Sequence, residues 1–363
     1  MVRATIHLAE VELGARLTRT CAVFAVLGLV ALIAAPFAHV PAAALAALAA
    51  SWLFFAGLAA GGVALSAAAR LAYGRFLEPA LQLAESPAAF FPAALVLLAI
   101  VLSAAPRWMP AASHATITGL FVRDFGAAIV LFAAGAWFLQ GSARRRWAGS
   151  RTAIAAVAYL IVYALTLSVW AIDLVMSLIE SAPSGIVPVQ TFMAAFLSAI
   201  AWATLLSARR HLDPVVRLDL GRLLYGFAAF WAYLVWCSFL PVWYANLPEE
   251  VGEILGRVEG FWAVVSWGVI VATFVVPFVA LLSEAAKRNR IVVGLGATSV
   301  LVGLYAERFL LLVRPVSPSG GLRALVFGAA VAAGVAGAFT LIVGARLARS
   351  KSPDRVGAAP AAG

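Results

Sequence analysis

The sequence predicts an all-α polytopic membrane protein with about ten transmembrane helices. Of its 363 residues, 64% are hydrophobic and only 12% are charged, and the mean hydropathy is +1.01. A water-facing surface needs more polar residues than this composition supplies. The apolar residues fall in blocks of about 18 to 28 residues, and a helix of that length crosses a hydrocarbon core of about 30 Å. These blocks are therefore predicted to be membrane spans.

Short polar breaks separate these blocks. The ten predicted spans cover residues 20–36, 43–69, 88–104, 119–140, 153–179, 186–207, 223–246, 259–283, 291–313 and 322–345. Residues 1–350 are expected to form one integral membrane domain. Residues 3–18 carry too many charges for a signal peptide and favour a surface helix, whereas residues 351–363, rich in Ala, Gly and Pro, favour a disordered tail.

The arginines and lysines are distributed unevenly between alternate breaks. Twenty lie on the side of the N-terminus, and only four lie on the opposite side: Arg107, Arg257, Arg314 and Arg323. Cytoplasmic loops collect basic residues, so this asymmetry predicts that both termini, and the tail 351–363, are cytoplasmic in a bacterial inner membrane. It also accounts for the net charge of +10 without any binding of nucleic acid.

The chain has few residues that could hold a redox cofactor. Cys21 and Cys237 are far apart in the sequence, and the four histidines (His7, His39, His114 and His211) lie outside the predicted spans. Haem and iron–sulfur clusters need clustered cysteines or histidines at the right depth. The sequence therefore predicts no metal and no redox cofactor bound by this chain.

Five charged residues lie inside the predicted spans, four or more residues from either span end: Arg123, Asp124, Asp173, Glu307 and Arg308. Each costs about 2.5 to 3.5 kcal/mol at the middle of a membrane helix, so such residues need partners or a function. All five fall in the periplasmic half of the predicted bundle, and Asp173 and Glu307 lie about 10 Å below its periplasmic surface. The next periplasmic loop adds Glu249 and Glu250, next to Tyr244 at the end of span 223–246.

Two interpretations of these eight residues stay open. In the first, Arg123 and Arg308 neutralise the carboxylates in a structural ion-pair layer, with Arg308 the expected partner of Asp173. In the second, the residues line a periplasm-facing polar cavity that handles protons or binds a polar head group, since buried carboxylates can accept protons released by a substrate.

Several segments resemble the ActF subunits of bacterial alternative complex III, which are NrfD-like membrane proteins. They are the sequences AIDLVMSL at 171–178, DLGRLL at 219–224, FWAY at 230–233 and WYANLPEE at 243–250. The resemblance covers roughly residues 150–315, and the earlier residues agree only in hydropathy. The loop around His114 is shorter here than in the family.

The resemblance implies a fold of two four-helix bundles with a peripheral helix at each end. It also implies a membrane subunit of a quinol:electron-acceptor oxidoreductase, non-catalytic alone. The implied partners are a sister NrfD-like subunit, an iron–sulfur subunit and c-type cytochrome subunits. Those partners would carry the haem c and the iron–sulfur clusters, and this chain would contact lipid and quinone or quinol. The alternatives are a purely structural membrane anchor and a stand-alone proton channel or secondary transporter.

Overall fold

The computed structural model describes residues 15–109, 118–144, 150–178, 184–210, 212–246 and 248–349. Throughout this part of the chain the regular structure is helical, without strands. Ten of its helical segments are long and apolar enough to cross a membrane, which confirms the predicted fold class. Most of the expected surface helix, the tail 351–363 and His114 lie outside the described residues.

The first five spans are built from six helices. These are α1 (Ala15–Ala34), α2 (Pro41–Leu71), α3 (Glu78–Glu85) with α4 (Phe91–Ser103), α6 (Gly126–Arg144) and α7 (Ser150–Trp170). The last five spans are α8 (Ile186–Arg209), α9 (Pro214–Ala245), α11 (Gly260–Ile270) with α12 (Val276–Ala280), α14 (Arg290–Val313) and α15 (Leu322–Arg349). Two short helices, α10 (Pro248–Val258) and α13 (Glu284–Arg288), lie between spans.

Eight of the spans form two neighbouring groups of four. In the first bundle, α2 packs on α4, α6 and α7; in the second, α8 and α14 pack on each other, with α9 on α8 and α11 on α14. Contacts of α2 with α8 and α14, and of α7 with α8, join the two bundles. Helix α2 is therefore the most buried span of the protein.

Small residues allow α2 and α8 to approach closely. A Cβ atom added to Gly61 would lie 2.3 Å from the carbonyl oxygen of Ala195, well inside van der Waals contact. Glycine and alanine at such positions let membrane helices pack backbone against backbone. This contact fixes the distance between the two bundles.

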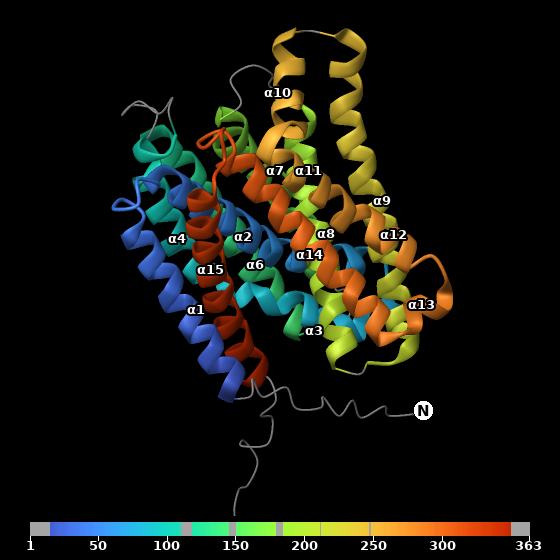
Figure 1. The fold of residues 1–363 in the computed structure, drawn as a ribbon. Helices are drawn as coiled ribbons and strands as arrows, with labels where there is room; N and C mark the ends of the chain where they lie inside the picture. Colours follow the sequence, from blue (N-terminus) through green and yellow to red (C-terminus); the bar gives the residue numbers. More distant parts are fainter. Residues whose placement is uncertain are drawn as a thin grey trace, which may run out of the picture.

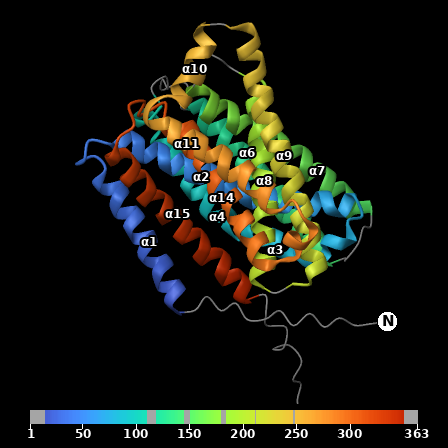
Figure 2. The same cartoon turned by 45° about the vertical axis from the view of Figure 1, so that its right-hand side comes forward.

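The first and last spans pack on each other at the edge of the molecule. Helix α1 has extensive contact only with α15, and the two run side by side in both ribbon views (Figures 1 and 2). Gly28 and Gly334 meet at the crossing, where a Cβ on Gly28 would lie 2.5 Å from the Cα of Gly334. The outer face of α1 exposes large apolar side chains, as a lipid-facing helix does.

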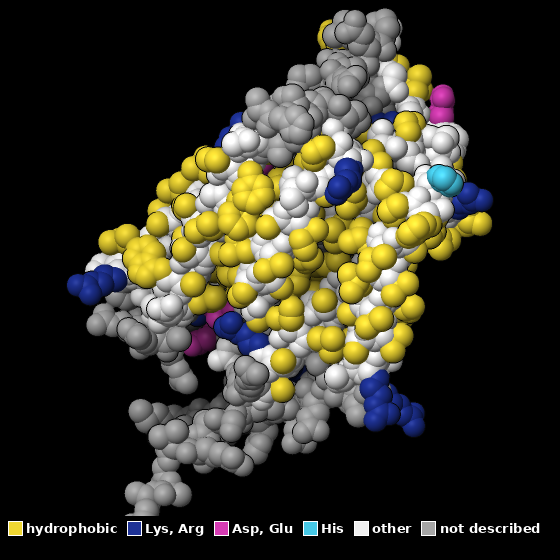
Figure 3. All heavy atoms as spheres, turned by 90° about the vertical axis from the view of Figure 1, so that its left-hand side faces the viewer, with side chains coloured by type: hydrophobic (Ala, Val, Ile, Leu, Met, Phe, Trp, Pro, Cys, Tyr) yellow, Lys and Arg dark blue, Asp and Glu magenta, His cyan; other side chains and the backbone are white. Residues whose placement is uncertain are grey.

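The surface is apolar over most of its area. Figure 3 shows one face of the molecule, on which hydrophobic side chains cover most of the described surface and Lys and Arg are few. In Figure 1, α1 begins and α15 ends at the same end of the molecule. We call this end proximal and the opposite end distal. The sequence predicts that the proximal end faces the cytoplasm.

Helices α9 and α10 project beyond the other helices at the distal end (Figure 2). Helix α9 has 32 residues and is about 48 Å long at 1.5 Å per residue, more than a hydrocarbon core of about 30 Å requires. It begins at Pro214 rather than near 223, because the side chain of Asp213 caps its first turn by accepting a hydrogen bond from Val215 N at 2.7 Å.

The third span also begins earlier than predicted, at Glu78 rather than at 88. A 3-10 helical stretch, Ser86–Phe90, joins α3 to α4 and contains Pro87, which cannot donate a backbone hydrogen bond. The predicted spans 43–69 and 88–104 left Glu78 and Glu85 in the break between them. The structure instead places Glu85 within the span, where an arginine of α2 neutralises it.

Candidate functional site

The charged residues predicted inside the spans form two polar centres, one in each bundle. Arg123, Asp124 and Asp173 lie together in the first bundle. Glu307 and Arg308 lie in the second, on α14. The structure thus pairs Asp173 with Arg123, and it pairs the expected partner Arg308 with Glu307 instead. Both centres lie toward the distal ends of their helices.

Two parallel hydrogen bonds join Arg123 to Asp173 in the first bundle. Nε and Nη2 of Arg123 each donate to one carboxylate oxygen of Asp173, both at 2.6 Å. The arginine side chain is 56% exposed, whereas that of Asp173 is 10% exposed. Both residues sit in π-helical turns, Phe121–Phe125 and Ala171–Val175. Such single wide turns are rare and often occur at functional sites.

Asp124 lies next to this ion pair and is completely buried. Neither of its carboxylate oxygens has a hydrogen-bond partner among the described residues. Trp170 contacts the same residue by donating from Nε1 to its backbone oxygen at 3.3 Å. A buried carboxylate without a partner is costly in its charged form, and the charge of Asp173 nearby adds to the cost. Asp124 is therefore suited to carry a proton.

The second polar centre consists of Gln190, Trp231, Glu307 and Arg308. One carboxylate oxygen of Glu307, Oε1, accepts hydrogen bonds from Gln190 Nε2 at 2.7 Å and from Trp231 Nε1 at 3.1 Å. The other oxygen, Oε2, lies 3.4 Å from Nη2 of Arg308 and has no hydrogen-bond partner among the described residues. Three helices, α8, α9 and α14, thus converge on one carboxylate.

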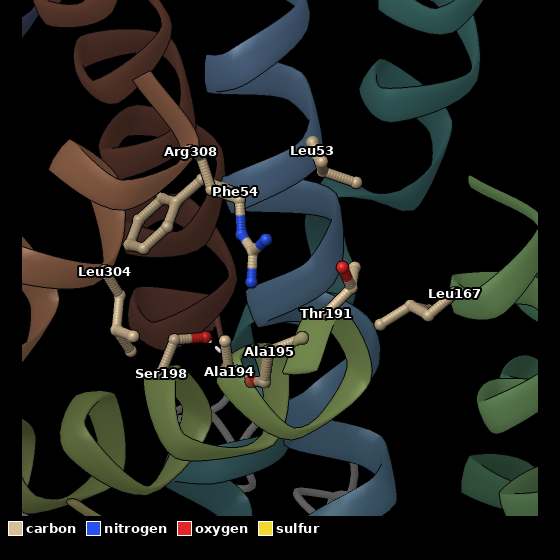
Figure 4. Close-up of a pocket in the computed structure, with 9 residues that line it drawn as sticks. All are labelled: Leu53, Phe54, Leu167, Thr191, Ala194, Ala195, Ser198, Leu304 and Arg308. Atoms are coloured by element: carbon tan, nitrogen blue, oxygen red, sulfur yellow. Dashed lines mark hydrogen bonds between the residues drawn. The ribbon is translucent and has the colours of Figure 1, made fainter. Parts of the chain in front are cut away.

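Arg308 reaches from this site toward the contact between the bundles. Figure 4 shows its guanidinium group directed between Thr191 and Ser198 of α8, with Leu53 and Phe54 of α2 nearby. The space there is about 10 Å³, roughly the room of one water molecule. Nη1 and Nη2 of Arg308 are buried without a hydrogen-bond partner among the described residues. A single bound water is the simplest group that could satisfy them.

A larger cavity of about 510 Å³ opens from the second polar centre. Its walls come mainly from α9 on one side and from α10 and α11 on the other. Glu307, Arg308 and Gln190 lie at its base, and Trp231, Trp236, Phe239 and Trp267 are among the side chains that line it. Small-molecule sites in proteins have this size and this mixture of aromatic walls with a few polar groups.

One of the predicted site residues, Tyr244, joins neither centre. Tyr244 is 86% exposed near the end of α9 and does not line the cavity, whereas Val242 of the same turn does. Glu249 and Glu250 belong to α10, but their side chains lie outside what the structure describes.

Sequence reasoning missed two kinds of residue. Gln190 and Trp231 carry no charge, so a search for buried charges passed over them, although an amide one turn inside a span is itself a costly residue. The pair of Arg70 with Glu85 was missed because Glu85 was placed in a loop. Glu85 Oε1 lies 3.3 Å from Arg70 Nη2 and accepts a hydrogen bond from Ser66 at 2.5 Å, in a cluster nearer the proximal end.

The described residues bring no three His, Cys, Asp or Glu side chains together as a metal site would require. No protein-family model matches the chain, and no curated protein matches it in sequence.

Proposed function

We propose that this chain is the integral membrane subunit of a quinol-oxidising respiratory or photosynthetic electron-transfer complex of the alternative complex III type. In this proposal it scaffolds a sister NrfD-like subunit and works with an iron–sulfur subunit and c-type cytochromes. It is not catalytic alone, because electrons leave the quinol through the haem c and iron–sulfur clusters of those partners. The distal end faces the periplasm of a bacterial inner membrane.

The observation that carries the proposal is the cavity over Glu307 and Arg308. A quinone head group has a flat ring with one polar oxygen at each side, and the cavity offers aromatic walls with polar groups at its base. The Glu307 carboxylate can accept a hydrogen bond or proton from a quinol hydroxyl, and Gln190 or Arg308 can donate to a quinone oxygen. The resemblance of residues 150–315 to ActF subunits supports the same class of complex.

The first polar centre supports a role in handling protons. Oxidation of a quinol releases protons, and Asp124 and Asp173 lie on the distal side, where these would leave the protein. The exposed arginine beside them forms an ion pair with Asp173, whereas the carboxylate oxygens of Asp124 have no hydrogen-bond partner among the described residues. Together the two centres favour a periplasm-facing proton or quinone-headgroup site over a continuous proton path.

The decisive experiment is purification of the tagged chain from its native membrane in a mild detergent. We expect c-type haem in the preparation, detected by its absorbance and by haem staining of the partner bands, together with quinone in a solvent extract. Purified alone after expression in another host, the chain should carry no haem. A preparation that lacks cytochromes but drives proton flux in vesicles would favour the stand-alone transporter instead.

A structural anchor is the second alternative, and a cavity variant separates it from the proposal. Ala232 lines the cavity and is half-buried, so Ala232→Trp should fill the space. Its neighbour Tyr233 is 58% exposed and does not line the cavity, which makes Tyr233→Trp a matched control. An anchor predicts equal quinone content and turnover in both complexes. The proposal predicts a loss of quinone in the Ala232→Trp complex alone.

A further inference from the structure

The cavity of the second bundle reaches the surface of the molecule at two tryptophans. Trp236 of α9 and Trp267 of α11 both line the cavity, yet they are 53% and 57% exposed. The polar side chains at its base are buried or half-buried by comparison. At these two tryptophans the cavity meets its surroundings through apolar side chains, and the half-buried Arg257 and the exposed Val258 of α10 line it as well.

This opening lies at the depth of the membrane interior. Trp267 is seven residues after the distal start of α11, about 10 Å along the helix. Glu307 is six residues before the distal end of α14, about 9 Å along that helix. The opening beside Trp267 and the polar base are thus at similar depths. A molecule passing between them would move parallel to the membrane plane.

The packing of α9 leaves room for such a passage. Helix α9 packs on α8 and, nearer its proximal end, on α12 and α13, but it has little contact with α11. The two helices are therefore walls of a slot that leads from the lipid to the base of the cavity. Gln190, Ser266 and Glu307 lie at the inner end of this slot, and the Ser266 hydroxyl is buried without a partner among the described residues.

The polar base of the cavity favours a small amphiphile over a helix of another protein. An apolar transmembrane helix in the cavity would leave the polar groups of Gln190, Ser266 and Glu307 without partners. A molecule with a hydrogen-bonding head and an apolar tail satisfies both ends of the slot.

We infer that the ligand of this cavity enters sideways from the lipid, with its head group at Gln190 and Glu307 and its apolar tail leaving between α9 and α11 past Trp267. The inference rests on the proposed function, since it takes the cavity to be the head-group site. It adds the route of entry and the position of the ligand's tail, and it excludes a water-soluble ligand that arrives from the distal end.

Two photoreactive probes test this route in the purified complex in phosphatidylcholine nanodiscs. One probe is a benzoquinone with a diazirine on its ring and an unmodified ten-carbon tail; the other carries the diazirine at the end of the same tail. Labelled peptides are mapped by mass spectrometry. We expect the ring probe on α8 or α14 near Gln190 and Glu307, and the tail probe on α9 or α11 near Trp236 and Trp267. Labelling by both should fall at least tenfold in Ala232→Trp and be unchanged in Tyr233→Trp.

The possible outcomes distinguish a failure of sideways entry from a failure of the proposed head-group site. Val187 at the distal start of α8 and Ile254 of α10 also line the cavity. Tail labelling near these two residues, with ring labelling unchanged, would overturn sideways entry but would still support the head-group site. Tail labelling of another subunit at the same slot would show that a partner helix fills it, which also overturns the inference. Ring labelling that is unchanged in the Ala232→Trp complex would contradict both the head-group site and the inference of sideways entry.

Discussion

Arg123 and Asp173 hold neighbouring helices of the first bundle together through two hydrogen bonds of equal length, but only the arginine is open to its surroundings. The two ends of the ion pair are therefore not equivalent. When the acid is lost, the arginine can turn outward. When the arginine is lost, Asp173 and Asp124 remain as two buried carboxyls side by side.

This asymmetry predicts unequal costs for the two substitutions. Asp173→Asn should lower the free energy of unfolding by about 1 kcal/mol, as for a partly exposed pair. Arg123→Gln should cost about 2 to 3 kcal/mol, because it strands buried carboxyls without their cation. Thermal unfolding in detergent of both single variants and of the double variant measures the difference. Equal destabilisation by the two single changes would contradict this account of the pair.

The same aspartate tests the proton role of the first centre. If these carboxylates receive protons from quinol oxidation, the Asp173→Asn complex should assemble with all its subunits but oxidise quinol more slowly or release fewer protons. Assembly is followed by subunit staining, and proton release by a pH dye during turnover. Normal assembly, turnover and proton yield together would remove Asp173 from the functional site.

Glu307 should matter more for stability than Gln190, which donates a hydrogen bond to it. Glu307→Gln leaves Arg308 buried without a counter-charge, at a cost of about 3 to 5 kcal/mol. Gln190→Leu removes one of two donors to Glu307 and should cost about 1 to 2 kcal/mol. Unfolding in detergent compares the two. Restored stability in Glu307→Gln combined with Arg308→Leu would identify the unpaired arginine as the cause, and no restoration would argue against it.

The approach of α2 to α8 gives a packing prediction with an internal control. Gly61→Ala would place a methyl group 2.3 Å from a backbone oxygen, so the helices must separate. We expect less folded protein and a lower unfolding temperature. Gly226 on α9 has no atom within 4 Å of an added Cβ, and Gly226→Ala should be harmless. Similar behaviour of the two variants in size-exclusion chromatography and thermal unfolding would refute the close contact.

The sides of the membrane are tested by reporter fusion. A reporter that is active only in the periplasm should be silent when fused after Arg355, because the excess of basic residues places that end in the cytoplasm. The same reporter fused after Gly321, ahead of α15, should be active. The opposite pattern would show that the distal end faces the cytoplasm.

The ten spans could be predicted from the sequence, because the hydropathy of about twenty consecutive residues decides whether a segment crosses the membrane. The charged residues of both polar centres were also found, since each stands out against an apolar background. Their pairing was not, because Asp173 and Glu307 lie at similar depths and depth alone does not tell which bundle a side chain faces. Gln190 and the cavity depend on how α8, α9 and α14 converge, which no local pattern encodes.

The paired projection of α9 and α10 affects any soluble protein that would sit on the distal end. Helix α10 alone has 11 residues and rises about 16 Å, and it stands beside the last turns of α9 (Figure 1). A partner with a flat surface could not contact the remaining helices, because α9 and α10 project beyond them. A partner that contacts the rest of the distal face must have a recess that accommodates α9 and α10, so this projection would fix the relative orientation of the two proteins.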